Sequence, residues 1–137
     1  MNYWLIKSEP TNWSWLDQNK VKTTMWDGVR NYQARNNLKT MKKNDLCFFY
    51  HSVNEKQILG IVSVTREHYP DPTDKTGKFV VVNVKMEKSL PKPVTLNEIK
   101  NEKKLSHIAL VKQSRLSVMP IDFQSWKLIC KMGKLIT

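Results

Sequence analysis

Cysteine, glycine and acidic side chains are scarce in this chain of 137 residues, which contains two, four and 12 of them. The two cysteines, Cys47 and Cys130, lie far apart in apolar surroundings, so we expect buried free thiols in a reducing compartment and no disulfide framework. The three histidines have no metal-ligand spacing with one another or with the cysteines. We therefore expect no metal and no cofactor.

Long apolar runs are missing as well. No stretch approaches the ~20 consecutive apolar residues that a membrane-spanning helix needs. The opening residues, MNYWLIKSEP, place no basic segment ahead of their short apolar run, which argues against a signal peptide. We therefore expect no membrane partner.

The charge of the chain is strongly one-sided. Lysine and arginine number 23 against 12 acidic residues, which gives a formal net charge of +11. Such a surplus favours polyanions as partners, with nucleic acid first and an anionic membrane surface second. A coding bias toward lysine and asparagine codons would produce the same surplus, because 19 of the basic residues are lysine and the chain holds 11 asparagines. Arginine, whose planar fork lysine cannot copy, is confined to four positions: Arg30, Arg35, Arg66 and Arg115.

Hydrophobic periodicity predicts a single domain over residues 1–137 in which strands and short helices interleave. Helices are expected to begin at the caps Ser14, Asn31, Thr95 and Asp122. In the last helix Phe123, Trp126 and Cys130 are predicted to face inward. Strands are expected at residues 2–7, 45–52, 57–67, 79–87 and 115–120. Gly60 inside the third strand suggests a bend, so we predict an α+β fold: a small mixed barrel of about five strands with short helices packed around it.

The segment WDGVRNYQARNNL, residues 26–38, is unusually rich in polar groups for a turn and a helix that only have to pack. Trp26, which precedes an Asp-Gly turn, is either a plug of the core or the wall of an aromatic slot that stacks a base. Asn31 either caps the helix or turns its amide toward a ligand. Ala34, Leu38 and Met41 form the apolar stripe that would anchor this helix.

Three further clusters lie at predicted strand ends. Lys7, Ser8 and Glu9 could supply acid–base or nucleophilic groups, or could simply turn into solvent. The motif YHS, residues 50–52, is compatible with core, rim or ligand-binding positions. The motif RLSV, residues 115–118, could form a surface salt bridge or contribute Arg115 and Ser117 to a site. Together the clusters predict one concave site built from several segments.

Several stretches of the chain resemble the EVE domain family of the PUA-like superfamily, to which the YTH and ASCH domains are related. The matching segments follow in the order of that family: YWLIKSEP, WDGVRNYQARNNL, FYHS, YPDPT, PVTLNEIK and SRLSVMP. The resemblance extends from Tyr3 to about Ile129. It implies a small β-barrel with a pocket at its side, and a reader of modified bases in DNA or RNA.

Residue roles are also implied by this resemblance. It implies that Trp26 walls the pocket, that Ser8, Asn31, Tyr50, His51 and Ser52 line or support it, and that Arg30, Arg35 and Arg115 lie along the nucleic-acid backbone. To these the clusters at the strand ends add Ser117 as a ligand-binding residue and Lys7 as a backbone contact. We expect a monomer, located in the cytoplasm if the source is bacterial and in the nucleus if it is eukaryotic.

The leading hypothesis is therefore a nucleic-acid-binding module, not an enzyme, that recognises a methylated or hydroxymethylated base. An alternative is an ASCH-like amidohydrolase acting on modified nucleosides through the Lys7–Glu9 segment. Strand alternation argues against it, since Lys7 and Glu9 should share one face and Ser8 the other. A protein-interaction module is the third possibility.

Overall fold

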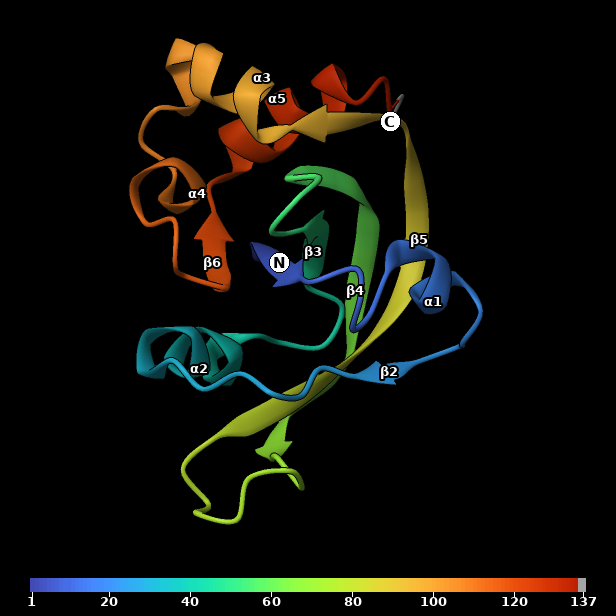
Figure 1. The fold of residues 1–137 in the computed structure, drawn as a ribbon, viewed down its shortest axis with the longest axis vertical. Coiled ribbons are helices and arrows are strands. Elements are labelled where there is room, and N and C mark those ends of the chain that lie inside the picture. Colours follow the sequence, from blue (N-terminus) through green and yellow to red (C-terminus); the bar gives the residue numbers. More distant parts are fainter. Residues whose placement is uncertain (136–137) are drawn as a thin grey trace.

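The computed structural model of the protein describes residues 1–135, which form six strands and short helices in alternation (Figure 1). The strands are β1 (Tyr3–Ser8), β2 (Thr24–Met25), β3 (Leu46–His51), β4 (Gln57–Pro70), β5 (Val80–Thr95) and β6 (Val118–Ile121). The helices are α1 (Trp15–Asn19), α2 (Tyr32–Thr40), α3 (Leu96–Asn101), the 3-10 turn η1 (Lys103–Leu105), α4 (Ala109–Lys112) and α5 (Phe123–Met132). The last two residues of the predicted domain lie outside the described range.

All six strands join one sheet in the order β2-β5-β4-β3-β1-β6. Only β1 and β3 pair in parallel, and the other neighbours are antiparallel. The long strands β4 and β5 curve around the central strands, as Figure 1 shows, and the β4–β5 register shifts at several bulges. The predicted mixed, curved sheet is confirmed, with six strands in place of about five because the two-residue β2 was not foreseen.

Gly60 lies at one of these bulges, and its missing side chain is required there. A Cβ atom at this position would lie 2.1 Å from Cζ2 of Trp15, so the indole of α1 occupies the space that any side chain would need. The indole Nε1 of Trp15 donates to Ser89 Oγ at 3.0 Å, and its backbone N–H donates to His51 Nε2 at 2.9 Å. Helix α1 is thereby fixed against three strands.

Strand β5 is much longer than predicted because it continues through two prolines. Pro91 and Pro93 lie beyond the short stretch of β5 that pairs with β2. In the pairing of β5 with β4, the residues between Ser89 and Val94 have no partner, so both prolines lie in a bulge. Proline is tolerated at such a bulge, since no ladder hydrogen bond is lost. The predicted end of the strand at residue 87 was therefore wrong.

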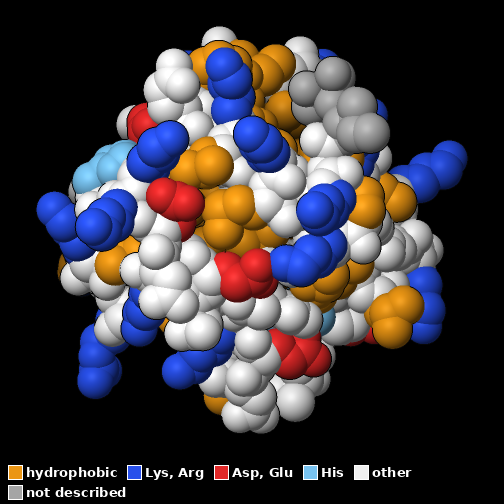
Figure 2. All heavy atoms as spheres, turned by 90° about the horizontal axis from the view of Figure 1, so that it is seen from above, with side chains coloured by type: hydrophobic (Ala, Val, Ile, Leu, Met, Phe, Trp, Pro, Cys, Tyr) orange, Lys and Arg blue, Asp and Glu red, His pale blue; other side chains and the backbone are white. Residues whose placement is uncertain are grey.

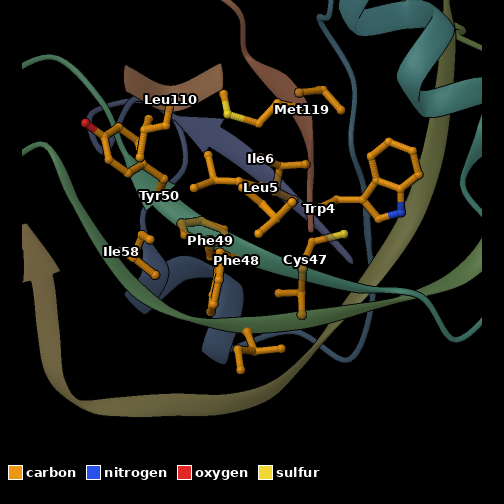
Figure 3. Packing of buried hydrophobic residues seen from close by; sticks show 14 of the residues in the cluster. Trp4, Leu5, Ile6, Cys47, Phe48, Phe49, Tyr50, Ile58, Leu110 and Met119 are labelled. Atoms are coloured by element: carbon orange, nitrogen blue, oxygen red, sulfur yellow. The ribbon is translucent and has the colours of Figure 1, made fainter. Parts of the chain in front are cut away.

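The core fills the space between the sheet and the helices (Figure 3). Phe48 and Phe49 of β3 are fully buried, as are the stripe residues Ala34, Leu38 and Met41, which confirms the predicted anchor of α2. Both cysteines are buried free thiols, as expected, and burial raises the pKa of each. Within residues 1–135, every helix is too short or too polar to cross a bilayer.

One inward-facing prediction was wrong. Phe123 is 51% exposed, whereas Trp126 and Cys130 on the same helix are buried. Phe123 follows the N-cap Asp122 directly, so it lies at the outer end of α5, and its ring stacks on Tyr3 at 5.3 Å between centroids.

Candidate functional site

A cavity of about 680 Å³ opens at the side of the sheet, between the end of β1, the turn before α1, strand β2 and the loop that leads into α2. It brings together six of the predicted site residues from three segments: Lys7, Ser8, Trp26, Arg30, Asn31 and Ser117. Ser117 reaches this place because its carbonyl accepts the backbone N–H of Lys7 at 2.9 Å, extending the pairing of β1 with β6. The expectation of one concave site made from several segments agrees with this arrangement.

Trp26 belongs to both the core and the cavity. Its backbone N–H donates to Val82 at 2.8 Å, which continues the β2–β5 pairing, and its ring packs edge-on against Phe49 at 5.5 Å. Only 7% of the residue is exposed, yet it lines the cavity. Trp26 is therefore part of the core and also lines the cavity.

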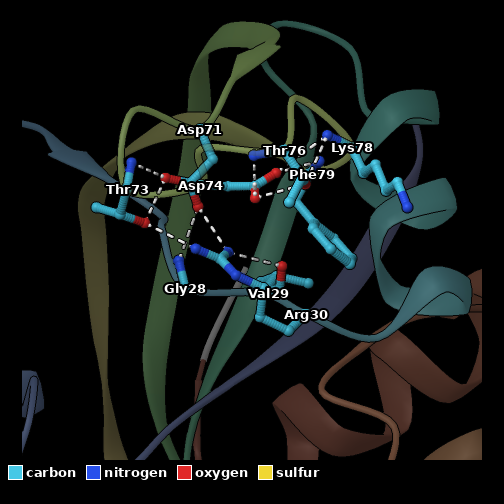
Figure 4. A network of polar contacts seen from close by, with 9 residues as sticks. All are labelled: Gly28, Val29, Arg30, Asp71, Thr73, Asp74, Thr76, Lys78 and Phe79. Carbon is cyan, nitrogen blue, oxygen red and sulfur yellow. Dashed lines mark hydrogen bonds and ion pairs between the residues drawn. The ribbon is translucent and has the colours of Figure 1, made fainter.

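The loop beside Trp26 is held by a buried carboxylate on a distant segment. Asp71 accepts hydrogen bonds from Gly28 N and Arg30 Nη1, both at 3.0 Å, and from the backbone and hydroxyl of Thr73 (Figure 4). Gly28 has φ +79°, which glycine adopts without strain. Burial alone would raise the pKa of Asp71, but the hydrogen bonds from Thr73, Gly28 and Arg30 lower it below its ordinary value. The carboxylate is therefore charged when it holds the loop.

Arg30 is largely committed to this network. Its guanidinium also donates to the carbonyl of Val29 and to Thr73 Oγ1, and it lies 5.3 Å from the ring centroid of Phe79. Its charge is compensated by Asp71 at 3.0 Å. These contacts make Arg30 a clamp of the cavity loop, which the sequence had suggested only as a phosphate contact.

Asn31 caps α2, because its Oδ1 accepts the N–H of Ala34 at 2.9 Å. Its Nδ2 makes no hydrogen bond within residues 1–135, and the residue is exposed at the cavity. The two interpretations are thus compatible: the oxygen serves the helix, and the amide N–H groups are available to a ligand.

Lys7, Ser8 and Glu9 all line the cavity, but the side chains of Lys7 and Ser8 reach different partners. Both residues belong to β1, so strand alternation applies to them. The Ser8 hydroxyl donates to the carbonyl of Trp13, and Lys7 Nζ donates to Ser114 O at 2.9 Å. Burial lowers the pKa of the Lys7 ammonium group.

Tyr50, His51 and Ser52 lie behind the cavity and do not line it. Tyr50 is buried, and the centroid of its ring lies 5.7 Å from Lys7 Nζ. Burial raises the pKa of the Tyr50 hydroxyl to about 12. His51 is held between Trp15 N and Glu55 Oε2, and Ser52 N donates to Ser8 O at 2.9 Å. The structure therefore gives these residues supporting positions.

The two remaining predicted arginines lie outside the cavity. Arg35 donates to Lys78 O at 3.1 Å and lies 4.8 Å from the ring centroid of Tyr32. Arg115 is exposed on the segment that precedes Ser117. Basic side chains also gather around a hydrophobic hollow at the α3 and α5 end of the molecule, where Figure 2 shows Lys and Arg side chains around apolar atoms.

Several lining residues were missed from the sequence: Asn12, Trp13, Thr24, Met25 and Asp27. Trp13 returns to the cavity because its backbone N–H closes a turn onto Glu9 O at 2.9 Å. Its indole donates to Gln18 Oε1 at 2.8 Å. The available signal was a large aromatic residue in the polar stretch EPTNWS, outside any predicted strand that could bury it.

A curved mixed sheet with short helices around it and a tryptophan-walled cavity at its side defines this molecule as a PUA-like domain. The chain belongs to the EVE domain family, which matches residues 2–132. The family predicted from the sequence motifs is thereby confirmed.

Three relatives show how close the similarity is. Thymocyte nuclear protein 1 of Rattus norvegicus is 32% identical over 96% of this chain and 73% of that protein. A solved structure from Rhodopseudomonas palustris is 48% identical, with a TM-score of 0.94 over 100% of this chain and 96% of its own. The human THYN1 protein, solved in complex with DNA containing 5-methylcytosine, is 29% identical, with a TM-score of 0.91 over 100% of both chains.

A more distant similarity links the fold to the ASCH domains. An ASCH protein from Zymomonas mobilis is 7% identical, with a TM-score of 0.62 over 96% of this chain and 99% of its own. At that identity the match shows a shared fold alone.

Proposed function

We propose that this chain forms one EVE domain, a monomer that binds nucleic acid and holds a modified base in the cavity beside Trp26. The observation that carries the proposal is that Trp26 and Trp13 line one cavity of about 680 Å³ together with polar groups that the fold leaves free. A cavity of this kind suits a flipped or unpaired base, because indole faces stack on bases and polar groups read the base edge.

The partner in this proposal is DNA or RNA carrying a methylated or hydroxymethylated base. Human THYN1, which shares the fold at 29% identity, was solved with DNA containing 5-methylcytosine, and this supports DNA as the first polymer to test. The donor groups proposed to face the base are Asn31 Nδ2 and the hydroxyl of Ser117. Lys7 and Arg115 are proposed to contact the nucleic-acid backbone, since Lys7 lines the cavity and Arg115 is exposed two positions before Ser117. Neither has a carboxylate partner within residues 1–135.

Supporting roles complete the proposal. Tyr50, His51 and Ser52 hold the end of β3 against β1 behind the cavity, and Ser8 holds the turn that carries Trp13. Arg35 is proposed to contact the backbone from α2.

The proposal is tested by fluorescence anisotropy with short DNA duplexes that are identical except for one central base: cytosine, 5-methylcytosine or 5-hydroxymethylcytosine. RNA oligonucleotides with the same substitutions form a second series. Tighter binding of a modified base than of cytosine supports the proposal. Equal affinity for all three bases at every salt concentration would remove the modified-base reader from consideration.

An amidohydrolase remains the competing function, because Lys7, Ser8 and Glu9 meet in the cavity and burial lowers the pKa of Lys7. Incubation with acylated nucleosides separates the two. A reader gives no product above background. Turnover that disappears in Lys7→Ala or Glu9→Gln would establish the enzyme instead.

A further inference from the structure

Asp27 of the cavity loop combines a backbone that is held in place with a carboxylate that has no partner among the described residues. Its own N–H donates to Met25 O at 3.1 Å, and the following N–H, of Gly28, donates to Asp71 at 3.0 Å. The backbone is therefore held on both sides of Asp27. The side chain is exposed, lines the cavity next to Trp26, and makes no hydrogen bond or ion pair within residues 1–135.

The other carboxylates near the cavity are already engaged. Asp71 accepts four hydrogen bonds and is buried. Glu9 accepts the hydroxyl of Thr11 at 2.9 Å at the cavity edge. An ionised carboxylate is an acceptor only, so Asp27 offers a ligand two oxygens and no proton.

The same cavity also offers hydrogen-bond donors to a ligand. Asn31 Nδ2 has no partner among the described residues, and the hydroxyl of Ser117 can donate. A wall with donors at one place and a carboxylate at another complements a base edge that carries a ring acceptor beside an amino group. Cytosine presents N3 beside its N4 amino group, and adenine presents N1 beside its N6 amino group. Thymine and uracil place a carbonyl oxygen where the amino group would be, and that oxygen would face the carboxylate.

We propose that Asp27 accepts a hydrogen bond from the exocyclic amino group of the bound base, so that the cavity takes bases of the cytosine and adenine type and rejects those of the thymine and uracil type. This inference rests on the proposed function, since it assigns the specificity of that same cavity. Carboxylates accept from the cytosine amino group in the same way in DNA grooves. Rejection comes from the repulsion between the carboxylate and a carbonyl oxygen.

The test uses three duplexes with guanine opposite the central base, which is cytosine, 5-methylcytosine or thymine. Thymine and 5-methylcytosine share the 5-methyl group, so their comparison isolates the amino group. The thymine–guanine mismatch opens more easily than the 5-methylcytosine pair, so base flipping alone would favour thymine. A preference for 5-methylcytosine therefore originates in the cavity.

We expect the wild-type protein to prefer 5-methylcytosine over thymine by about tenfold or more. Asp27→Asn should bring that ratio close to one, because an amide can turn its N–H groups toward a carbonyl. Glu67→Gln is the matched control: it removes the same charge from an exposed residue that does not line the cavity, and it should keep the wild-type ratio. Circular dichroism and melting temperature show that each variant is folded.

The outcomes separate this inference from the proposed function. If 5-methylcytosine and cytosine bind equally, but Asp27→Asn still abolishes rejection of thymine, the role of Asp27 stands and the modified-base reader falls. If the wild-type protein prefers the methylated base and Asp27→Asn keeps the full discrimination against thymine, the role of Asp27 is overturned alone. A wild-type protein that binds none of the three duplexes and none of the RNA oligonucleotides overturns both.

Discussion

Asp71 accepts a hydrogen bond of 3.0 Å from the backbone N–H of Gly28, a residue 43 positions earlier in the chain. The same oxygen accepts Arg30 Nη1 at 3.0 Å. One buried carboxylate after β4 therefore fixes both the turn that follows Trp26 and the arginine that precedes α2. The shape of the cavity depends on a loop that contributes no residue to its lining.

Replacing this carboxylate should destabilise the fold and disturb the site together. Asp71→Ala leaves Gly28 N and the Arg30 guanidinium without their acceptor, and we expect the free energy of unfolding to fall by about 1–3 kcal/mol. Urea denaturation measures the loss. Asp27→Asn, which changes an exposed and unpartnered carboxylate in the same loop, should unfold like the wild type. Equal stability of Asp71→Ala and wild type would show that the hydrogen bonds of Asp71 do not stabilise the fold.

Trp26 should influence both stability and base preference, because the ring packs on Phe49 and also lines the cavity. Trp26→Ala should lose ~3–5 kcal/mol of stability. Trp26→Phe keeps an aromatic ring in the core and should remain folded, with a reduced preference for the modified base over cytosine. Melting temperatures and both affinities are measured on each variant.

Arg115→Ala is the control for the Trp26 variants. The exposed guanidinium of Arg115 is expected to contact the nucleic-acid backbone, so its loss should lower the affinity for all duplexes alike. A folded Trp26→Phe variant with undiminished preference would remove Trp26 from the site.

The surplus of lysine should make the affinity for nucleic acid depend on the salt concentration. If the net charge of +11 serves nucleic-acid binding, the logarithm of the affinity should fall linearly with the logarithm of the salt concentration. A slope corresponding to roughly 3–6 phosphate contacts is expected. Anisotropy titrations between low and physiological salt give the slope. A nearly flat line would leave coding bias as the better explanation of the charge.

Acid should unfold the protein partly through Asp122, the N-cap of α5. Burial alone would raise its pKa, but hydrogen bonds from the Ser125 hydroxyl, His107 and Ser125 N lower it to about 2. A folded-state pKa below the unfolded value of ~3.9 contributes stability that is complete above about pH 4 and lost as the pH falls through about 2.

Asp122→Asn tests this, since asparagine can still cap the helix but does not titrate. Stability measured by urea denaturation between pH 5 and pH 2 should fall less steeply in the variant than in the wild type. Identical slopes would show that the titration of Asp122 contributes nothing to acid unfolding.

Local sequence patterns predicted the elements whose cause is local. The capping boxes at Ser14 and Thr95 are both present, and the α2 stripe is buried, because caps and helical periodicity act within a few residues. Strand β2 was not predicted because two residues are too few to show an alternation of apolar and polar side chains. The passage of β5 through Pro91 and Pro93 depends on how β4 bulges opposite, which no local pattern encodes.

The residues of the site divide in the same way, into those that local patterns predicted and those that they did not. Trp26 and Asn31 were noticed because a segment that only has to pack needs fewer polar groups, and the RLSV motif supplied Ser117. Trp13 and Asp71 did not, because one reaches the cavity through a turn and the other acts across 43 positions. Long-range contacts of this kind become visible only when the chain is folded.

The contact between Gly60 and Trp15 constrains how this domain can vary. Because a Cβ atom at residue 60 would lie 2.1 Å from the indole and 2.7 Å from the carbonyl oxygen of Lys88, a side chain can enter there only if the ring at residue 15 shrinks or leaves and the β5 backbone shifts. The two positions should therefore change together during evolution, although 45 residues separate them in sequence. Among related chains, those that lose the glycine should also lack a large ring on the first helix.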